Sequence, residues 1–400
     1  MYAPQNGSRA SLRFKAQSDS DESTGTMNEP QQRHGRDRAQ DTQQPRQTGQ
    51  TQQTRLESKS PEKAVEWFLK KRKREPATSD KTIRNNRYNL KKFREWADET
   101  GFQDMRTMTA TVADDYIGWV HDKDLAPMTT QNIVRTFRTL LQYGEGRFIV
   151  DGTAEYVIVD PVDEDDEVRT EYITAETATD VLDYLYKYEY TSLRHILFHL
   201  IWRTGARRGA IHGLDVNDWH PEDRYLEFYH RPKTGTTLKN KSKGERAVYV
   251  HDDRLAESLD DWVARGRADT TDEHGREPLL STDSGRLHKT AISYNVAVAT
   301  RPHYYTNVEP AECPCVQEGG ENEGEDKCLG TVNENAFKCG ESIGPHALRR
   351  SAVTALLNRG NAKQDIGERV DMSTDIMDKH YNQQTREESM DVRRDRMDVA

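Results

Sequence analysis

Three short segments of the chain combine residue types that could act together on a phosphate group. The segment T-G-A-R ends at Arg207, the segment G-P-H-A-L-R-R holds His346 and Arg349, and a later segment, M-S-T-D-I-M-D-K-H-Y, ends at Tyr381. Two arginines from separate helices could clamp a phosphate bidentately. A tyrosine can serve as the nucleophile in covalent catalysis. The pattern therefore predicts covalent chemistry on a phosphodiester.

The spacing within the second segment adds a geometric expectation. His346 and Arg349 are three residues apart, so on a helix they project from one face. Pro345 precedes them and suits the first turn of a helix, where free N–H groups also attract anions. We therefore expect a helix that begins near Pro345 and presents both side chains together.

These three motifs, in this order, resemble the tyrosine recombinase (phage integrase) family. The motifs are T-G-x-R, then H-x-x-R, then a late tyrosine after a Ser-Thr pair, and the resemblance covers roughly residues 60–385. The segment E-R-V-D-M-S-T-D-I-M-D-K-H-Y is similar to the haloarchaeal branch of the family. The resemblance implies a site-specific DNA recombinase, or integrase, that acts on double-stranded DNA as a homo-oligomer, with four protomers on two duplexes.

The resemblance also implies a role for each motif residue. Arg207 and Arg349 would hold the non-bridging oxygens of the scissile phosphate, and His346 would assist by proton transfer or hydrogen bonding. Tyr381 would attack to form a 3′-phosphotyrosyl link and free a 5′-hydroxyl. A lysine on a β-hairpin would be the general acid: Lys239 and Lys241 are the candidates, and both lie on one side if the segment is extended. Catalysis would need no cofactor.

Two departures from the family pattern stand out. Ala210 occupies the position three residues after the first arginine, where the family usually has an acid. The family's second histidine or tryptophan falls nine or ten residues before the nucleophile, where this chain has Met372 and Asp371. Asp371 is a secondary candidate for a hydrogen-bonding role, and His380 is another, although it is the immediate neighbour of the tyrosine on its helix.

The elements that position these residues are predicted to be mainly α-helical with a small β-sheet. We expect a disordered arm over residues 1–58, a helical, SAM-like core-binding domain that contacts DNA over 59–150, an acidic linker over 151–170, and a catalytic domain over 171–390 with a cysteine-rich insert at 311–340. Residues 391–400 would form a tail. Strands are expected at Tyr225–His230 and Ala247–Val250, and Asp80 is expected to cap the second helix of the helical domain.

Basic side chains recur on one side of that second helix. From residue 61 to 100 the chain has 12 lysines or arginines against 7 acids, whereas the net charge of the whole chain is -10. Phosphate binding needs such a local cluster, although a basic run can also be a solvated face. The candidate DNA-binding residues are Lys81, Arg84, Arg87, Lys91 and Arg94.

All four cysteines of the chain fall in the insert. Cys313, Cys315, Cys328 and Cys339 follow a C-x-C, C, C spacing in an acidic, glycine-rich stretch. Four soft ligands in one loop predict a structural zinc site, and the alternative is a loop with free thiols.

The composition limits the remaining classes. The chain has 34% hydrophobic and 32% charged residues, and no run of about 18 apolar residues that would span a membrane. We expect a cytoplasmic protein, and the acidic surface favours a halophilic origin over an ordinary acidic protein. Two alternative functions remain open, a type IB topoisomerase-like enzyme and a non-catalytic DNA-binding regulator derived from an integrase.

Overall fold

The computed structural model describes residues 56–76, 78–147, 149–162, 171–380 and 390 of the 400-residue chain. Two separate hydrophobic cores lie within these residues, one in a helical domain that begins at Leu56 and one in a C-terminal domain that begins at Glu171. Most of the predicted arm, the acidic linker beyond residue 162 and most of the predicted tail fall outside the described residues. No described helix combines the length and the apolar character that crossing a membrane requires.

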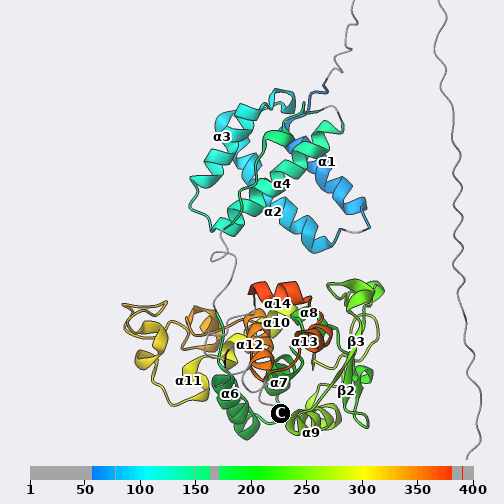
Figure 1. The fold of residues 1–400 in the computed structure, drawn as a ribbon, viewed down its shortest axis with the longest axis vertical. Helices are drawn as coiled ribbons and strands as arrows, with labels where there is room; N and C mark the ends of the chain where they lie inside the picture. Colours follow the sequence, from blue (N-terminus) through cyan, green and yellow to red (C-terminus); the bar gives the residue numbers. More distant parts are fainter. Residues whose placement is uncertain (1–55, 77, 148, 163–170, 381–389, 391–400) are drawn as a thin grey trace, which may run out of the picture. The chain divides into compact units, whose positions relative to one another are not determined.

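The helical domain consists of four helices around an aromatic core (Figure 1). Phe93, Tyr116 and Phe137 meet at its centre, with ring centroids 4.5–5.3 Å apart. The helices are α1 (Pro61–Arg74), α2 (Asp80–Thr100), α3 (Ala110–His121) and α4 (Pro127–Glu145), with 3-10 turns at Met105–Thr107 and Ala154–Tyr156.

Two details of this domain differ from the sequence-based prediction. The cap of α2 is Ser79, whose hydroxyl accepts a hydrogen bond from the backbone N–H of Thr82, so the predicted cap at Asp80 is wrong by one residue. Ser79 has extended backbone angles and can therefore turn its oxygen toward the free N–H groups. The chain after α4 also keeps packing on the core through Val150, Ala154 and Val157, so the domain continues beyond residue 150.

The C-terminal domain is built around α7 (Leu193–Thr204). This helix is buried on nearly all sides, as its apolar sequence predicts, and it packs against α6 (Ala175–Tyr188), α9 (Asp253–Asp261), α10 (Lys289–Ala299) and α12 (Pro345–Asn358). The domain also contains α8 (Arg208–Gly213), α11 (Pro302–Tyr305), α13 (Lys363–Val370), α14 (Thr374–His380) and a π-helical turn at Trp262–Gly266.

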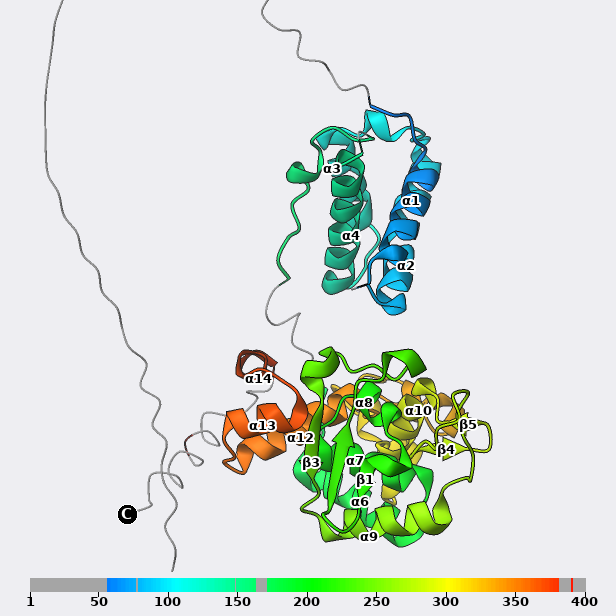
Figure 2. The ribbon, with the colours of Figure 1, turned by 90° about the vertical axis from the view of Figure 1, so that its right-hand side faces the viewer.

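A small antiparallel sheet lies at one side of this domain. Its strand order is β1 (Trp219–His220), β2 (Tyr225–Phe228) and β3 (Arg246–Tyr249), and a separate two-stranded pair is formed by β4 (Ser281–Thr282) and β5 (Gly285–Arg286). Leu226 pairs with Val248, and both side chains are buried. Figure 2 shows β3 beside α13, which it contacts. The predicted class, mainly α with a small sheet, is confirmed.

Two buried histidines, His195 and His199, and the half-buried His212 give the fold a pH dependence that can be tested. Burial lowers the pKa of His195 from its ordinary value of 6.5 to about 4, and lowers that of His212 to about 4 and that of His199 as well. The unfolded chain binds protons between these values while the native state does not. The free energy of unfolding should therefore fall as the pH drops from about 6.5 to about 4, by on the order of 3 kcal/mol for His195 alone.

Urea unfolding between pH 7.5 and 4.5 measures this slope. His195→Asn should flatten it, since an amide oxygen can still accept the hydrogen bond that the N–H of Thr191 donates to Nδ1. His274→Asn changes an exposed histidine and should leave the slope unchanged. Equal slopes in His195→Asn and the parent chain would contradict the assignment.

Candidate active site

The first arginine of the motif set follows a helix that ends in a left-handed turn. Gly205 caps α7 with φ of 58°, and its N–H donates to the carbonyl of Ile201 at 2.9 Å. A Cβ atom at Gly205 would lie 2.8 Å from Cγ1 of Val370, so both the backbone angles and the close approach require glycine. The turn places Arg207 at the start of α8 with its side chain 22% exposed.

Arg207 is paired with Asp371, which comes from the other end of the domain's sequence. An NH1 hydrogen of Arg207 is donated to Oδ2 of Asp371 at 2.6 Å, and Nδ2 of Asn240 donates to Oδ1 of the same carboxylate at 2.7 Å. Asp371 ends α13 in the left-handed region, with φ of 56°. The secondary candidate Asp371 thus contacts the predicted catalytic arginine directly, and Met372, the other residue at this position of the pattern, is buried.

The second arginine, Arg349, lies inside the domain. Its side chain belongs to α12 and the residue is 1% exposed. NH1 donates to the carbonyl oxygens of Gly205 at 2.5 Å and Val370 at 2.8 Å, the residues just before the turn to Arg207 and just before Asp371. His346 lies on the first turn of the same helix and is exposed. The predicted helix is therefore present, but its two motif residues lie at different depths.

Arg246 is a further cation at this place that the motifs did not reveal. Nε of Arg246 donates to the carbonyl of Arg369 at 2.6 Å, and its guanidinium lies 4.5 Å from the ring of Phe228. Burial lowers the pKa of Arg246 to about 10; Asp371 opposes this shift, whereas Arg349 and Arg207 add to it. A signal was present in the sequence, since strand alternation puts Arg246 on the same face as Val248, which is buried.

The two candidate lysines lie on the connection between β2 and β3. Lys239 and Lys241 are exposed and flank Asn240, the residue that holds Asp371. The connection is not extended there: Lys241 has φ of 54° and begins a 3-10 turn, Lys241–Gly244. The extended segment that would put both lysines on one side is therefore not present, and the choice between them stays open.

An arginine–aspartate network anchors this connection to the helix that follows Arg207. Arg276 donates to Oγ1 of Thr236 at 3.0 Å, in the connection. Arg286 donates to the carbonyl of Leu214 at 3.0 Å, just after α8. Both guanidinium groups pair with Asp272, at 2.8 and 2.9 Å. Because the carboxylate of Asp272 binds both arginines, the lysine-bearing connection and the helix that begins at Arg207 are held together through this network.

The predicted nucleophile, Tyr381, lies outside the described residues. Helix α14, the last element before it, ends at His380, and only the backbone of His380 is described. Helix α14 packs against α13 through the buried Met377. An open depression of about 620 Å³ lies between the β2–β3 connection and the segment from α13 to Thr374, and both Asp371 and Arg246 line it.

The helical domain presents its predicted basic residues on the surface of α2. All five are exposed, and two of them form ion pairs within the domain: Lys91 with Glu95 at 3.5 Å, and Arg94 with Glu62 at 2.8 Å. Within the described part of the chain, Lys81, Arg84 and Arg87 form no ion pair.

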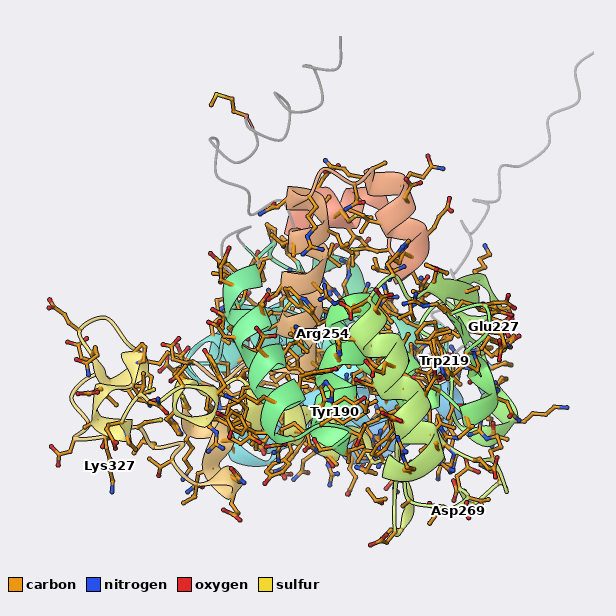
Figure 3. The ribbon with its side chains drawn as sticks, turned by 90° about the horizontal axis from the view of Figure 1, so that it is seen from below. Tyr190, Trp219, Glu227, Arg254, Asp269 and Lys327 are labelled. Atoms are coloured by element: carbon orange, nitrogen blue, oxygen red, sulfur yellow. The ribbon has the colours of Figure 1, made fainter. Side chains whose placement is uncertain are left out.

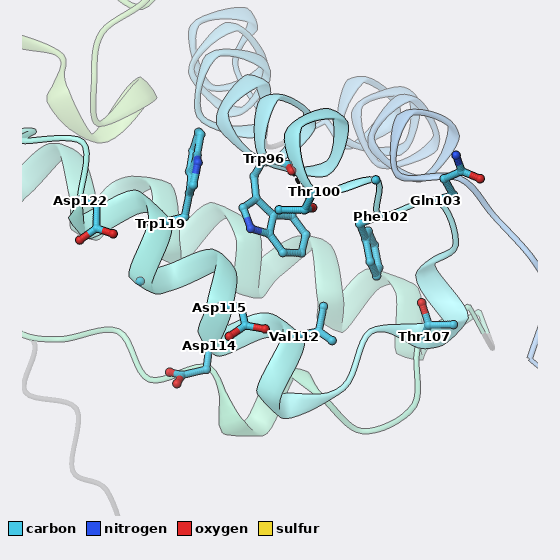
Figure 4. A pocket seen from close by; sticks show the side chains of 12 residues that line it. Trp96, Thr100, Phe102, Gln103, Thr107, Val112, Asp114, Asp115, Trp119 and Asp122 are labelled. Atoms are coloured by element: carbon cyan, nitrogen blue, oxygen red, sulfur yellow. Dashed lines mark hydrogen bonds between the residues drawn. The ribbon is translucent and has the colours of Figure 1, made fainter.

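A cleft of about 830 Å³ lies elsewhere in this domain, between the end of α2 and α3 (Figure 4). Asp114, Asp115 and Asp122 line it beside Trp119, whose indole N–H donates to Glu99 at 2.8 Å. Four carboxylates repel a phosphate backbone, so the basic side of α2 is the better surface for nucleic acid.

The four cysteines lie together in the insert before α12. Their Sγ atoms are all within 4.8 Å of one another and all four residues are buried. They are a separate site from the arginines, and the structure brings together every member of the predicted metal-ligand set.

Comparisons with known proteins match the helical domain to a family model. Residues 65–146 match the family model described as the phage integrase N-terminal SAM-like domain. The N-terminal domain of a phage integrase/site-specific recombinase from Haloarcula marismortui is 31% identical, with a TM-score of 0.25; the match covers 26% of this chain and 99% of that one. A comparison with curated protein sequences gave no match.

Two larger solved structures have the same fold at low sequence identity. A Tn1549 transposon integrase in complex with a circular intermediate DNA is 12% identical, covers 83% of this chain and 99% of its own, and has a TM-score of 0.55. A lambda integrase tetramer bound to a Holliday junction is 14% identical, covers 80% of this chain and 79% of its own, and has a TM-score of 0.52.

The buried position of Arg349 predicts a cost for its replacement. In Arg349→Lys a single ammonium group replaces the planar guanidinium and cannot keep its geometry toward the carbonyls of Gly205 and Val370. A buried carbonyl that loses its donor costs about 1–3 kcal/mol. The free energy of unfolding, measured in urea, should fall by that amount.

Arg254→Lys is the matched control, because Arg254 forms an exposed ion pair with Asp183 and should change stability by less than about 0.5 kcal/mol. Equal stability losses in the two variants would show that the buried contacts of Arg349 do not stabilise the fold.

Proposed function

We propose, from the premise that this chain belongs to the tyrosine recombinase (phage integrase) family, that it is a site-specific DNA recombinase that cuts and rejoins double-stranded DNA. Its match to the SAM-like domain and its identity to the haloarchaeal integrase domain carry the family assignment. The observation that supports the chemistry is a set of contacts at the end of α13. Arg207 and Asn240 of the β2–β3 connection both bind the carboxylate of Asp371, and Arg349 binds the carbonyl of the preceding residue, Val370.

Arg207 is the proposed phosphate-binding group of this site. It is partly exposed, and a carboxylate already binds its guanidinium at 2.6 Å. A carboxylate and a phosphate present similar pairs of oxygens to a guanidinium. Asp371 thus keeps Arg207 oriented in the free protein, and an entering phosphate exchanges with or joins it.

Arg349 acts in this proposal mainly by shaping the site. Its NH1 group holds the carbonyls on either side of the Arg207–Asp371 pair, which fixes the distance between the two segments. A network of buried cations also favours the negative charge that accumulates on a phosphate in the transition state. Arg246 belongs to the same positive cluster.

The covalent step is assigned to Tyr381. Its hydroxyl gives up its proton to His346 or to water, and its oxygen attacks the phosphorus to form a 3′-phosphotyrosyl bond while the bond to the 5′ oxygen breaks. That oxygen takes a proton from Lys239 or Lys241 and leaves as a 5′-hydroxyl. His346, exposed at the start of α12, is assigned a hydrogen bond to the phosphate. In the reverse reaction a 5′-hydroxyl attacks the phosphotyrosine and restores the tyrosine.

The DNA contacts outside this centre are assigned to α2. Lys81, Arg84 and Arg87 recur at helical spacing on the exposed side of that helix, so they can follow a phosphate backbone. Exchange of strands between two duplexes requires four cleavages, and we propose a tetramer of this chain on two duplexes. The lambda integrase tetramer on a Holliday junction, which has the same fold, supports that assembly.

Replacing the nucleophile tests this proposal most directly. Tyr381→Phe removes only the attacking oxygen, so covalent trapping on duplexes made from the DNA that flanks the protein's own gene should disappear while DNA affinity stays within about twofold. Denaturing gels measure the trapped adduct, and gel-shift titration measures the affinity.

Tyr172→Phe, at an exposed tyrosine of the same domain, should trap DNA normally. A normal adduct in Tyr381→Phe would overturn the assignment. Strand transfer between two duplexes supports a recombinase, relaxation of one supercoiled plasmid without transfer would identify a topoisomerase, and binding without either would identify a regulator.

A modified leaving group separates the two lysines. A sulfur at the bridging 5′ position leaves without needing a proton, so loss of the general acid does not slow cleavage of that substrate. The variant of the true general acid, Lys239→Ala or Lys241→Ala, should cleave the oxygen substrate about 10²–10⁴-fold more slowly and the sulfur substrate at the parent rate.

The other lysine variant is the internal control, because both side chains are exposed on the same connection. If neither variant recovers on the sulfur substrate, the proton comes from a group outside this pair.

A further inference from the structure

The insert between α11 and α12 has almost no apolar core. Between Cys313 and Cys339 the sequence has six acidic residues against two basic ones. The insert contains short 3-10 turns, Pro314–Val316 and Asn333–Lys338. Its own buried cluster consists of the four cysteines with Val316 packed against them, and Ala336 is buried against α10. This small amount of apolar burial does not offset the entropy lost when the segment becomes ordered. Another source of order is therefore required.

The four thiols have the spacing of a tetrahedral metal site. Sγ of Cys313 lies 3.3 Å from that of Cys315 and 3.9 Å from that of Cys339. All four cysteines are free rather than joined in disulfides. Sulfur ligands at about 2.3 Å from a tetrahedral metal lie about 3.8 Å from one another, a value between these two separations.

The backbone around the thiols is shaped to let them converge. A Cβ atom at Gly330 would lie 2.6 Å from Cβ of Cys339, and one at Gly340 would lie 3.1 Å from Cβ of Cys315. The N–H of Gly330 donates to Sγ of Cys328 at 3.3 Å. Hydrogen bonds of this kind orient a ligand and stabilise its thiolate form.

We propose that Cys313, Cys315, Cys328 and Cys339 form a structural zinc site. Four thiolates with tetrahedral separations fit Zn²⁺, and they fill every coordination position, so no open position remains for a substrate or water. The proposal rests on the geometry of the insert and does not depend on the recombinase assignment.

The bound metal fixes the path of the chain into α12. Arg301, between α10 and α11, is 1% exposed and donates to the carbonyl of Gly330, which lies between Cys328 and Cys339, at 2.6 Å. Just after the insert, the N–H of Ile343 donates to Oγ1 of Thr300 at 3.0 Å. Cys339 is five residues before Gly344, the N-cap of the helix that carries His346. The metal thereby ties the α10–α11 corner to the beginning of α12.

The insert projects from the C-terminal domain rather than lining the arginine site. In Figure 3, Lys327 marks the outer end of the insert, and Glu227 of β2 lies on the opposite side of the domain. The site therefore acts by holding structure, and zinc removal should affect catalysis only through α12.

Metal analysis of the full chain, purified without added metal, tests the site. Plasma mass spectrometry should find one zinc per chain, and thiol reagents should titrate the four cysteines only after chelation or denaturation. Replacement with Co²⁺ should give intense sulfur-to-cobalt charge-transfer absorption and tetrahedral d–d bands. Cys328→Ser should reduce the zinc content to near zero, whereas Leu329→Ser, at the exposed neighbouring residue, should keep it.

Three outcomes would overturn the proposal: four reactive thiols with less than about 0.1 metal per chain, a disulfide among the cysteines, or bound iron with visible absorption. If Cys328→Ser is insoluble, the metal content and the cobalt spectrum of the parent chain decide the question.

Hydrogen exchange tests the proposed effect on α12. Chelation should increase amide exchange in residues 313–343 and in the first turn of α12, and should leave the core of the helical domain unchanged. Unchanged exchange at the first turn of α12 after the zinc has been removed would contradict the role in positioning that helix.

Discussion

One buried guanidinium group constrains most of the candidate active site. Arg349 projects from α12 and donates to the carbonyl oxygens of Gly205 and Val370, which end two other helices. A buried cation is tolerated only where hydrogen-bond acceptors surround it, and the free carbonyls at helix C-termini are such acceptors. Helices α7 and α13 therefore both end where their terminal carbonyl groups can accept hydrogen bonds from the guanidinium of Arg349 on α12.

The same constraint explains why two residues here adopt left-handed backbone angles. Gly205 and Asp371 are the C-caps of α7 and α13, and at each of them the chain leaves its helix in a left-handed turn. Arg207 and Asp371 then meet at 2.6 Å although 164 residues separate them in sequence. Glycine can adopt this angle without strain, and aspartate tolerates it better than most residues. An aspartate at position 371 therefore suits both the left-handed backbone and the ion pair with Arg207.

Much of this arrangement could be predicted from the sequence, and the failures have identifiable causes. Pro345 and the spacing of His346 and Arg349 located α12, because both signals are local. Spacing alone placed His346 and Arg349 on one helix but could not show that one is exposed and the other buried, since depth is set by the elements that pack around the helix. The path of the chain between the two lysines could not be predicted, because the connection turns at Lys241 beside the tertiary contact from Asn240 to Asp371. Arg246 was missed because no motif contains it, although its place on the buried face of a strand was readable.

The distribution of charge, rather than its sum, decides how a chain of net charge -10 can approach DNA. Many of its cations are unavailable to a phosphate backbone: Arg276 and Arg286 are bound to Asp272, and Arg349 is enclosed. Lys81, Arg84 and Arg87 remain exposed without ion pairs in the described structure, and three aspartates of the same domain line a different cleft. Counterion release on binding follows the number of phosphates that such groups contact. The salt dependence of DNA binding should therefore reflect this small set of cations, while the acidic remainder of the surface determines solubility and the cost of approach at low ionic strength.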